Sequence, residues 1–310
     1  MSLERNTGQP ALACDGLTVR YGRRVAVDDL SLEVERGTVY ALLGRNGAGK
    51  TSAIRCLLGL QKADGGRIGL LGADPWKKRA RLMQRVGVVP EQPDAPPDLT
   101  PKQLTKFCAR LYRTWDQDAA LTRLAKLRVP EKVAFKNLSR GQKTQTLLTL
   151  ALGHNPELLV LDDPSLGLDA VAKKDLVDEL SDYMADRAAS VFITTHDLYS
   201  VEGLADRIGI MRQTHLLVDE PAESLKARFR LLRYRLADGV EPGPELAGFQ
   251  VVDRPKSSWG HEAIVSNFTE EAFAGLAGHP GLESAAHDSL PLEGIFCAVA
   301  GDNNNGEGVQ

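Results

Sequence analysis

The fold class of this 310-residue chain follows from one stretch, Gly44-Arg45-Asn46-Gly47-Ala48-Gly49-Lys50-Thr51. An apolar run at residues 39–43 precedes it and is typical of a buried strand. Behind it, Ile54 and Leu57 are spaced for one apolar face of a helix. Strand, glycine-rich loop and helix in this order are the setting in which G-x-x-x-x-G-K-[ST] predicts a phosphate-binding loop.

The residue types suit that chemistry. Glycines adopt positive φ and let backbone N–H groups approach an anion without a Cβ in the way. Lys50 supplies a cation for the β and γ phosphates, and Thr51 supplies a hydroxyl for Mg²⁺. A glycine turn beside a surface lysine is the alternative, and the flanking strand and helix argue against it. The stretch therefore predicts binding of a nucleoside triphosphate.

Composition narrows the class of protein. The chain is 43% hydrophobic and 25% charged, and no apolar run approaches the ~20 residues of a membrane span. Residues 1–10 are polar and lack a signal-peptide core, so we expect a cytoplasmic protein that reaches a membrane only through a partner. The four cysteines are scattered, which favours reduced thiols over a disulfide or a zinc site. A net charge of −3 gives no reason to expect nucleic acid.

Strands and helices alternate over the first two thirds of the chain. Residues 12–21 and 25–34 are expected to pair as antiparallel strands around a turn at 21–24. A helical segment is expected at about 97–155, and a charged helix at 172–187. Strand-like runs flank these helices at 158–161, 191–194 and 208–211. This order predicts an α/β core with a largely parallel sheet.

Past residue 222 the pattern changes to short strands and a helix at 269–277, which predicts a small α+β appendage. Residues 226–235 carry a basic cluster that favours a solvated edge strand over a lipid or partner contact. The expected parts are a tail at 1–10, a nucleotide-binding domain at 11–222, an accessory domain at 223–300 and a disordered tail at 301–310.

Three further motifs follow the phosphate loop. Residues 158–163 are expected to form an apolar strand that ends in Asp162 and Asp163. Two carboxylates at a strand end are suited to hold Mg²⁺ and to orient a water. Ser139 and Gln142 precede a helix and also fit a capping box, so a purely structural role is the alternative. His196 follows the next strand, and a histidine at a strand end is by itself more often structural than catalytic.

In this order and spacing, residues 11–220 resemble the ATP-binding subunits of ABC transporters. The phosphate loop resembles that family's Walker A motif, and residues 158–163 its Walker B strand. Residues 138–142 resemble the L-S-G-G-Q signature, residues 165–169 the D-loop, and His196 the switch histidine. Tyr21 is similar to the aromatic residue that stacks on adenine. GTPases are disfavoured because the chain has no N-K-x-D motif.

Three positions depart from the family pattern. Arg140 replaces the first glycine of the signature, and Asp163 replaces the usual catalytic glutamate. Glu91 stands where the family has a glutamine after the strand, with Gln92 next. Either of these two side chains could reach the water around Mg²⁺. The shorter Asp163 leaves open a slow or non-hydrolysing ATP-dependent switch.

The resemblance implies the fold of an ABC-type P-loop NTPase, with an antiparallel β subdomain and a helical subdomain. It implies catalytic roles for Asp163, His196, Glu91 and Gln92. It implies a Mg²⁺ site at Thr51, Asp162 and Glu91, reached partly through water. The nucleotide-binding residues would be Tyr21, Gly44, Arg45, Asn46, Gly47, Ala48, Gly49, Lys50, Thr51, Ser52, Ser139, Gly141, Gln142 and Asp169.

The resemblance also implies partners. ATP would be held in a head-to-tail dimer, where Ser139 and Gly141 of one protomer close over the γ-phosphate held by Lys50 of the other. The second protomer could be an identical chain or a paired ATPase subunit. Residues 290–296 resemble the end of the accessory domain in drug and antibiotic exporters, whose membrane permease is a separate chain. This implies a place on the inner face of the cell membrane. A soluble ABC ATPase that acts on ribosomes or DNA is the competing class.

Overall fold

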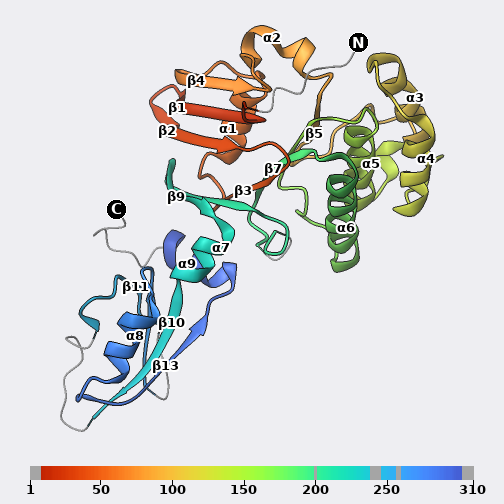
Figure 1. Ribbon diagram of the computed structural model, residues 1–310. Coiled ribbons are helices and arrows are strands. Elements are labelled where there is room, and N and C mark those ends of the chain that lie inside the picture. Colours follow the sequence, from red (N-terminus) through yellow and green to blue (C-terminus); the bar gives the residue numbers. More distant parts are fainter. Residues whose placement is uncertain (1–7, 199–200, 238–245, 256–259, 302–310) are drawn as a thin grey trace. The chain divides into compact units, whose positions relative to one another are not determined.

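The computed structural model describes residues 8–198, 201–237, 246–255 and 260–301 (Figure 1). Its internal contacts divide the chain into two compact units, Met1–Leu216 and Leu217–Gln310. The division falls within β9 (His215–Pro221), whereas the sequence placed the boundary after residue 222. Among the residues described, no helix has the length and apolar character needed to cross a membrane.

A mostly parallel sheet forms the centre of the first unit. Its strand order is β5 (Val86–Val89), β6 (Leu158–Asp162), β7 (Ser190–Thr195), β3 (Val39–Gly44), β8 (Arg207–Arg212) and β9. The four pairings from β5 to β8 are parallel. Every residue of β3, β6 and β7 is buried, as a sheet covered on both faces requires. The predicted α/β core is confirmed, and the carboxyl ends of β3, β6 and β7 meet at one edge.

A smaller antiparallel sheet has the order β2 (Arg24–Val34), β1 (Leu12–Tyr21) and β4 (Gly65–Leu70). Helix α1 (Lys50–Leu57) buries Ile54 and Leu57 in a hydrophobic core that also contains side chains from both sheets. The expected antiparallel pair at the start of the chain is therefore confirmed. Helix α2 (Pro75–Leu82), which the sequence pattern did not predict, begins after the N-cap Asp74.

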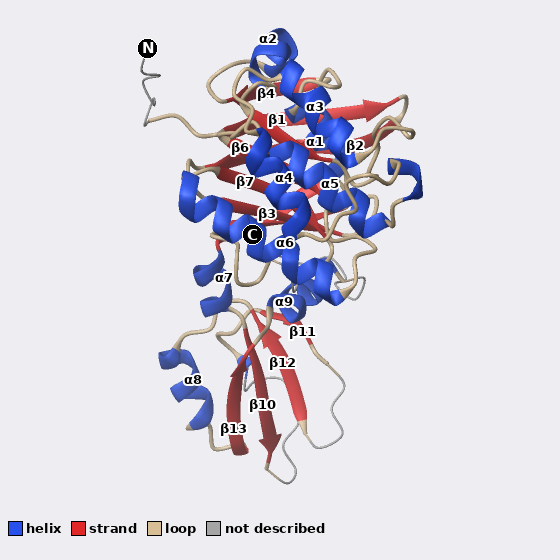
Figure 2. Ribbon diagram, turned by 90° about the vertical axis from the view of Figure 1, so that its right-hand side faces the viewer, coloured by secondary structure: helices blue, strands red, loops and turns tan. Residues whose placement is uncertain are grey.

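Three helices lie between β5 and β6 in the chain and form the helical subdomain (Figure 2). They are α3 (Pro101–Leu111), α4 (Gln117–Lys126) and α5 (Arg140–Leu152). Thr100 and Ser139 each begin a helix with a complete capping box. Such caps satisfy N–H groups that a helix cannot pair internally, which explains why α3 and α5 begin where they do.

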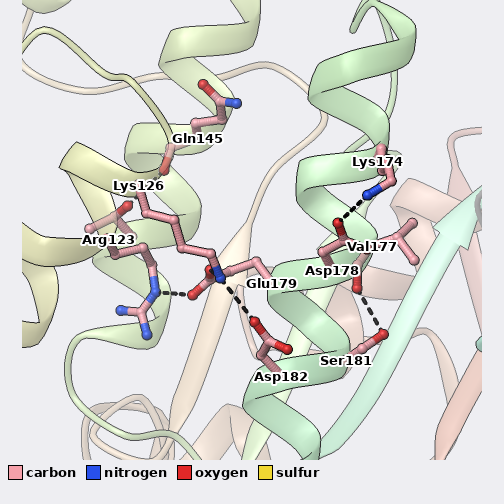
Figure 3. Close-up of polar contacts among 10 residues, drawn as sticks. Arg123, Lys126, Gln145, Lys174, Val177, Asp178, Glu179, Ser181 and Asp182 are labelled. Atoms are coloured by element: carbon pink, nitrogen blue, oxygen red, sulfur yellow. Dashed lines mark hydrogen bonds and ion pairs between the residues drawn. The ribbon is translucent and has the colours of Figure 1, made fainter.

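Helix α6 (Ala170–Arg187) is linked to α4 by ion pairs (Figure 3). Glu179, whose side chain is 7% exposed, accepts from Arg123 and from Lys126, the latter at 3.0 Å. Lys126 Nζ also lies 2.9 Å from Asp182 Oδ2. A buried carboxylate needs such partners because desolvation of an unpaired charge is costly. The ion pairs therefore hold the helical subdomain against the helix that follows β6.

The second unit is a four-stranded antiparallel sheet with helices, so the predicted α+β appendage is confirmed. Its order is β11 (Val251–Asp253), β12 (His261–Val265), β10 (Arg230–Leu236) and β13 (Leu282–Ser289). Its helices in the described residues are α7 (Ala222–Arg228), α8 (Glu270–Ala277) and α9 (Leu292–Ala300). The expected tails fall almost wholly outside the described residues.

The prediction of a basic edge strand was wrong. Strand β10 lies inside the sheet between β12 and β13. Arg233 faces carboxylates on both neighbours, Glu262 at 3.1 Å and Asp288. Arg228, just before the strand, pairs with Glu220 at 2.6 Å. Carboxylates therefore neutralise Arg228 and Arg233 of this cluster, and the pairs of Arg233 run across the strands.

Candidate functional site

The phosphate loop connects the end of β3 to the start of α1. Gly47 and Gly49 have φ values of 84° and 105°, which favour glycine. A Cβ on Gly49 would lie 2.2 Å from the carbonyl oxygen of Ala26, so any larger residue would clash with backbone. Residues 45–47 are exposed at the tip of the loop. The loop therefore presents backbone to solvent at a helix N-terminus, the arrangement that binds anions.

Lys50 lies under this loop with only 8% of its surface exposed. Its Nζ donates to the carbonyl oxygens of Gly44 at 2.6 Å and Arg45 at 3.3 Å. Burial lowers the pKa of Lys50 below its usual value. The carboxylates of Asp163, Asp162 and Glu91 act in the opposite direction and raise that pKa. The fold thus brings one buried ammonium within electrostatic reach of three predicted site carboxylates.

Two consecutive carboxylates at the end of β6 are held by two consecutive threonines of β7. Asp162 is the register partner of Thr194, whose hydroxyl donates to Asp162 Oδ1 at 2.6 Å. The Thr195 hydroxyl lies 3.3 Å from Asp163 Oδ1 and can donate to it. Both carboxylates are buried, at 5% and 6% exposure, and these hydrogen bonds supply partners that fix their orientation. No sequence motif identified either threonine.

Asp163 also contacts the predicted switch histidine. His196 Nδ1 lies 2.5 Å from Asp163 Oδ2, so both oxygens of the carboxylate have partners. The backbone of Asp163 has φ 48°, a left-handed conformation that is uncommon outside glycine. Its N–H donates to Thr194 O at 2.8 Å, which holds the turn in place. Strained backbone of this kind is concentrated at functional sites.

The loop after β5 and the start of α5 border one cavity of about 350 Å³. It is lined by Glu91, Gln92, Pro93, Arg140, Lys143 and Leu166. Glu91 is partly exposed and acts electrostatically on Lys50, and Gln92 is exposed. Both side chains line the cavity, and the charge of Glu91 is within electrostatic reach of the phosphate loop.

The predicted residues Ser139 and Asp169 act as helix N-caps. Ser139 Oγ accepts from the N–H of Gln142 at 3.2 Å, and Gln142 Oε1 accepts from the N–H of Ser139 at 3.0 Å. Asp169 Oδ1 accepts from the N–H of Ala172 at 2.8 Å. Ser139 and Asp169 are nevertheless exposed, and Gly141 is partly exposed. Capping therefore accounts for the geometry of Ser139 and leaves its surface accessible.

Tyr21 stands at the end of β1 with 45% of its surface exposed. Its hydroxyl donates to Gln61 Oε1 at 2.8 Å and lies 3.4 Å from the hydroxyl of Ser52 on α1. Ser52 follows Thr51 in the first turn of that helix. The structure thus places the predicted adenine-stacking ring beside the helix that starts at the phosphate loop.

Comparisons with known proteins agree with this geometry. A family model described as ABC transporter matches residues 27–166. The bacitracin transport ATP-binding protein BcrA of Bacillus licheniformis is 34% identical over 72% of this chain and 74% of its own length. The Nod factor export ATP-binding protein I of Burkholderia orbicola (strain AU 1054) is 36% identical over 91% of this chain and 94% of its own. The chain belongs to the ABC transporter family, as one of its ATP-binding proteins.

Solved structures show the same fold. An ATP-binding subunit of an ABC transporter is 24% identical, with a TM-score of 0.63, over 70% of this chain and 92% of its own. A dimeric ATP-binding cassette in a post-hydrolysis state, bound to ADP and Pi, has a TM-score of 0.61 at 19% identity. It covers 68% of this chain and 98% of its own. The predicted ABC-type P-loop fold is therefore confirmed.

Proposed function

We propose that this chain is the ATP-hydrolysing subunit of an export-type ABC transporter and drives a separate membrane permease. One observation carries the proposal: Lys50, Asp162, Asp163, Glu91 and His196 converge at the carboxyl ends of neighbouring strands. A phosphate cradle beside a carboxylate pair is the arrangement that phosphoryl transfer to water requires. The names of the relatives, which include bacitracin transport and Nod factor export, support the export role.

In this proposal the phosphates of ATP bind the N–H groups of the loop, and Lys50 exchanges its carbonyl contacts for phosphate oxygens. Thr51 and Asp162 would hold Mg²⁺, with Glu91 acting partly through water. Mg²⁺ would neutralise phosphate charge during transfer. Mg²⁺ takes few protein ligands and is commonly bound together with substrate phosphates, so phosphate oxygens would complete this site. Thr194 keeps the Asp162 carboxylate oriented for that role.

Asp163 is the proposed base that orients the attacking water, and His196 positions its carboxylate. The side chain is one methylene shorter than the family's glutamate, so it reaches about 1.5 Å less far. Hydrolysis by the isolated subunit is therefore proposed to be slow. Thr195 and His196 each contact one oxygen of the carboxylate, which leaves other lone pairs to accept from a water. An ATP-driven switch that scarcely hydrolyses is the second candidate, and the shorter reach of Asp163 favours it.

The proposed active form is a head-to-tail dimer of this chain with itself or with a paired ATPase subunit. Ser139 and Gly141 of one protomer would cover the γ-phosphate on its partner, and Asp169 would lie near the same interface. A dimeric cassette among the similar structures supports this arrangement. ATP then acts as the link between protomers, so that binding closes the dimer and hydrolysis opens it.

An apolar groove is the proposed contact for the permease. A cavity of about 460 Å³ lies between the core and the helical subdomain, with Leu60, Met83, Cys108 and Tyr112 among its lining residues. Leu60 is 53% exposed, so the groove presents apolar surface that a partner could cover. Docking there would place the chain on the inner face of the cell membrane, and no nucleic-acid partner is proposed.

Steady-state phosphate release by the purified protein tests this proposal. Asp163→Asn should bind ATP normally and release phosphate about a hundredfold more slowly, because the carboxylate that orients water is lost. Asp163→Glu should be severalfold faster than the native protein if reach is limiting. Equal rates for the native and Asn proteins would contradict the assignment of Asp163 and make His196 the next residue to test.

A further inference from the structure

An ion pair links α6 to the turn that carries His196. Lys173 Nζ lies 2.6 Å from Asp197 Oδ2, and the two side chains are 36% and 16% exposed. Lys173 is in the first turn of α6, the helix capped by Asp169. Asp197 is the residue after His196. The pair thus joins the start of α6, which follows the loop at 165–169 of the proposed dimer interface, to the residues after β7.

From Asp197 the contacts continue to the catalytic carboxylate. The backbone N–H of Asp197 donates to Thr195 Oγ1 at 2.8 Å. The Thr195 hydroxyl has one hydrogen and two acceptors within reach, Asp163 Oδ1 at 3.3 Å and the carbonyl oxygen of Asp197 at 3.4 Å. His196, between Thr195 and Asp197, contacts the other oxygen of Asp163. A displacement of Asp197 would therefore move both groups that orient the Asp163 carboxylate.

The ion pair is expected to fix the position of the turn rather than to stabilise the fold. Partly exposed ion pairs add little to the free energy of unfolding because water screens them. A small displacement of a catalytic group, in contrast, lowers the rate steeply. Removal of this pair should therefore affect turnover far more than stability or ATP affinity.

We propose that Lys173 is a positioning residue for ATP hydrolysis, which acts through Asp197 to hold the Thr195–His196 turn against Asp163. The inference rests on the proposed function, in which Asp163 orients the attacking water. The ion pair also joins the start of α6, the helix that follows the D-loop, to the turn that contacts that carboxylate.

The test measures kcat and KM for ATP with the full-length protein, together with single-turnover phosphate release, which resolves slow hydrolysis. Lys173→Ala should lower kcat about tenfold and leave KM within about twofold, because only the carboxylate is misplaced. Lys173→Arg, which can keep the ion pair, should recover most of the rate. Lys174→Ala is the matched control: among the described residues the neighbouring lysine forms its ion pair along α6, with Asp178 at 2.8 Å (Figure 3), and its loss should leave kcat unchanged.

A second measurement separates positioning from a general structural effect. If Lys173 acts through His196 and Asp163, then Lys173→Ala should have little further effect in an Asp163→Asn background, since coupled residues are not additive. A full tenfold effect in that background, or equal rates for Lys173→Ala and Lys174→Ala, would overturn the inference. Failure of the proposed function looks different, because Asp163→Asn would then match the native rate. A large drop in melting temperature in Lys173→Ala but not in Lys174→Ala would also contradict a positioning role for Lys173.

Discussion

The nucleotide site in the first unit and the sheet of the second unit both contain clustered charges, and they neutralise them differently. In the sheet, Arg228 and Arg233 each contact carboxylates of the same unit, Glu220 for the first and Glu262 and Asp288 for the second. In the site, the hydrogen bonds of Lys50 go to two carbonyl oxygens of its own loop. Lys50 can therefore exchange its carbonyl contacts for the phosphate oxygens of a ligand, whereas Arg228 and Arg233 are already neutralised by carboxylates.

Lys50 and Arg228 also differ in how deeply they are buried. Lys50 is almost fully buried, and desolvation lowers its pKa even though three carboxylates lie within electrostatic reach. Arg228 is half-buried and meets Glu220 through more than one N–H group. Substitution of Lys50 should therefore affect ligand binding most, and substitution of Arg228 should affect stability most.

The largest expected effect is the loss of ATP binding in Lys50→Ala. Removal of the ammonium deletes a charge-assisted contact to phosphate, so the affinity for ATP should fall by about a hundredfold or more. The fold should be kept, because the alanine also removes a buried charge. A titration with ATP measures the effect, and Arg233→Ala, which changes a cation of the second unit, is the control. Unchanged affinity in Lys50→Ala would contradict the phosphate-loop assignment.

A smaller effect is expected for Arg228→Ala, which should change stability and not ATP affinity. The guanidinium binds Glu220 and also donates to Ser266 O at 2.9 Å, so its loss should lower the free energy of unfolding by about 1–2 kcal/mol. ATP affinity should not change. Calorimetry of the full chain measures the destabilisation. Arg228→Lys should recover only part of it, because lysine cannot make the forked contact. A loss of ATP affinity would show that the two units are not independent in this respect.

The smallest effect is expected at Tyr21, which belongs to the nucleotide site but carries no charge. Stacking on adenine contributes about 1 kcal/mol, so Tyr21→Ala should weaken ATP binding several-fold. Tyr21→Phe and Tyr21→Trp should keep most of the affinity, although Phe loses the hydrogen bond to Gln61. If Phe binds ATP as weakly as Ala in the same titration, the hydroxyl matters and stacking is the wrong explanation.

Much of the fold was predictable from the sequence because its signals are local. The phosphate loop lies between a buried strand and an amphipathic helix, and all three are recognisable within some twenty consecutive residues. Continuous apolar runs at β3, β6 and β7 predict strands covered on both faces. Ser139 with Gln142 predicted the start of α5 through its capping box. In each case the residues that determine the structure are neighbours along the chain.

The sequence by itself therefore determined the α/β core, the phosphate loop and the pair of carboxylates after β6. Only the tertiary structure decided that β10 is an interior strand, since its position depends on β12 and β13, which follow it in the chain. It alone decided that Thr195 and His196 hold Asp163, and that Lys173 reaches Asp197. These contacts depend on the register of parallel strands and on the packing of α6. Register and packing are set by the whole core, so no local pattern encodes them.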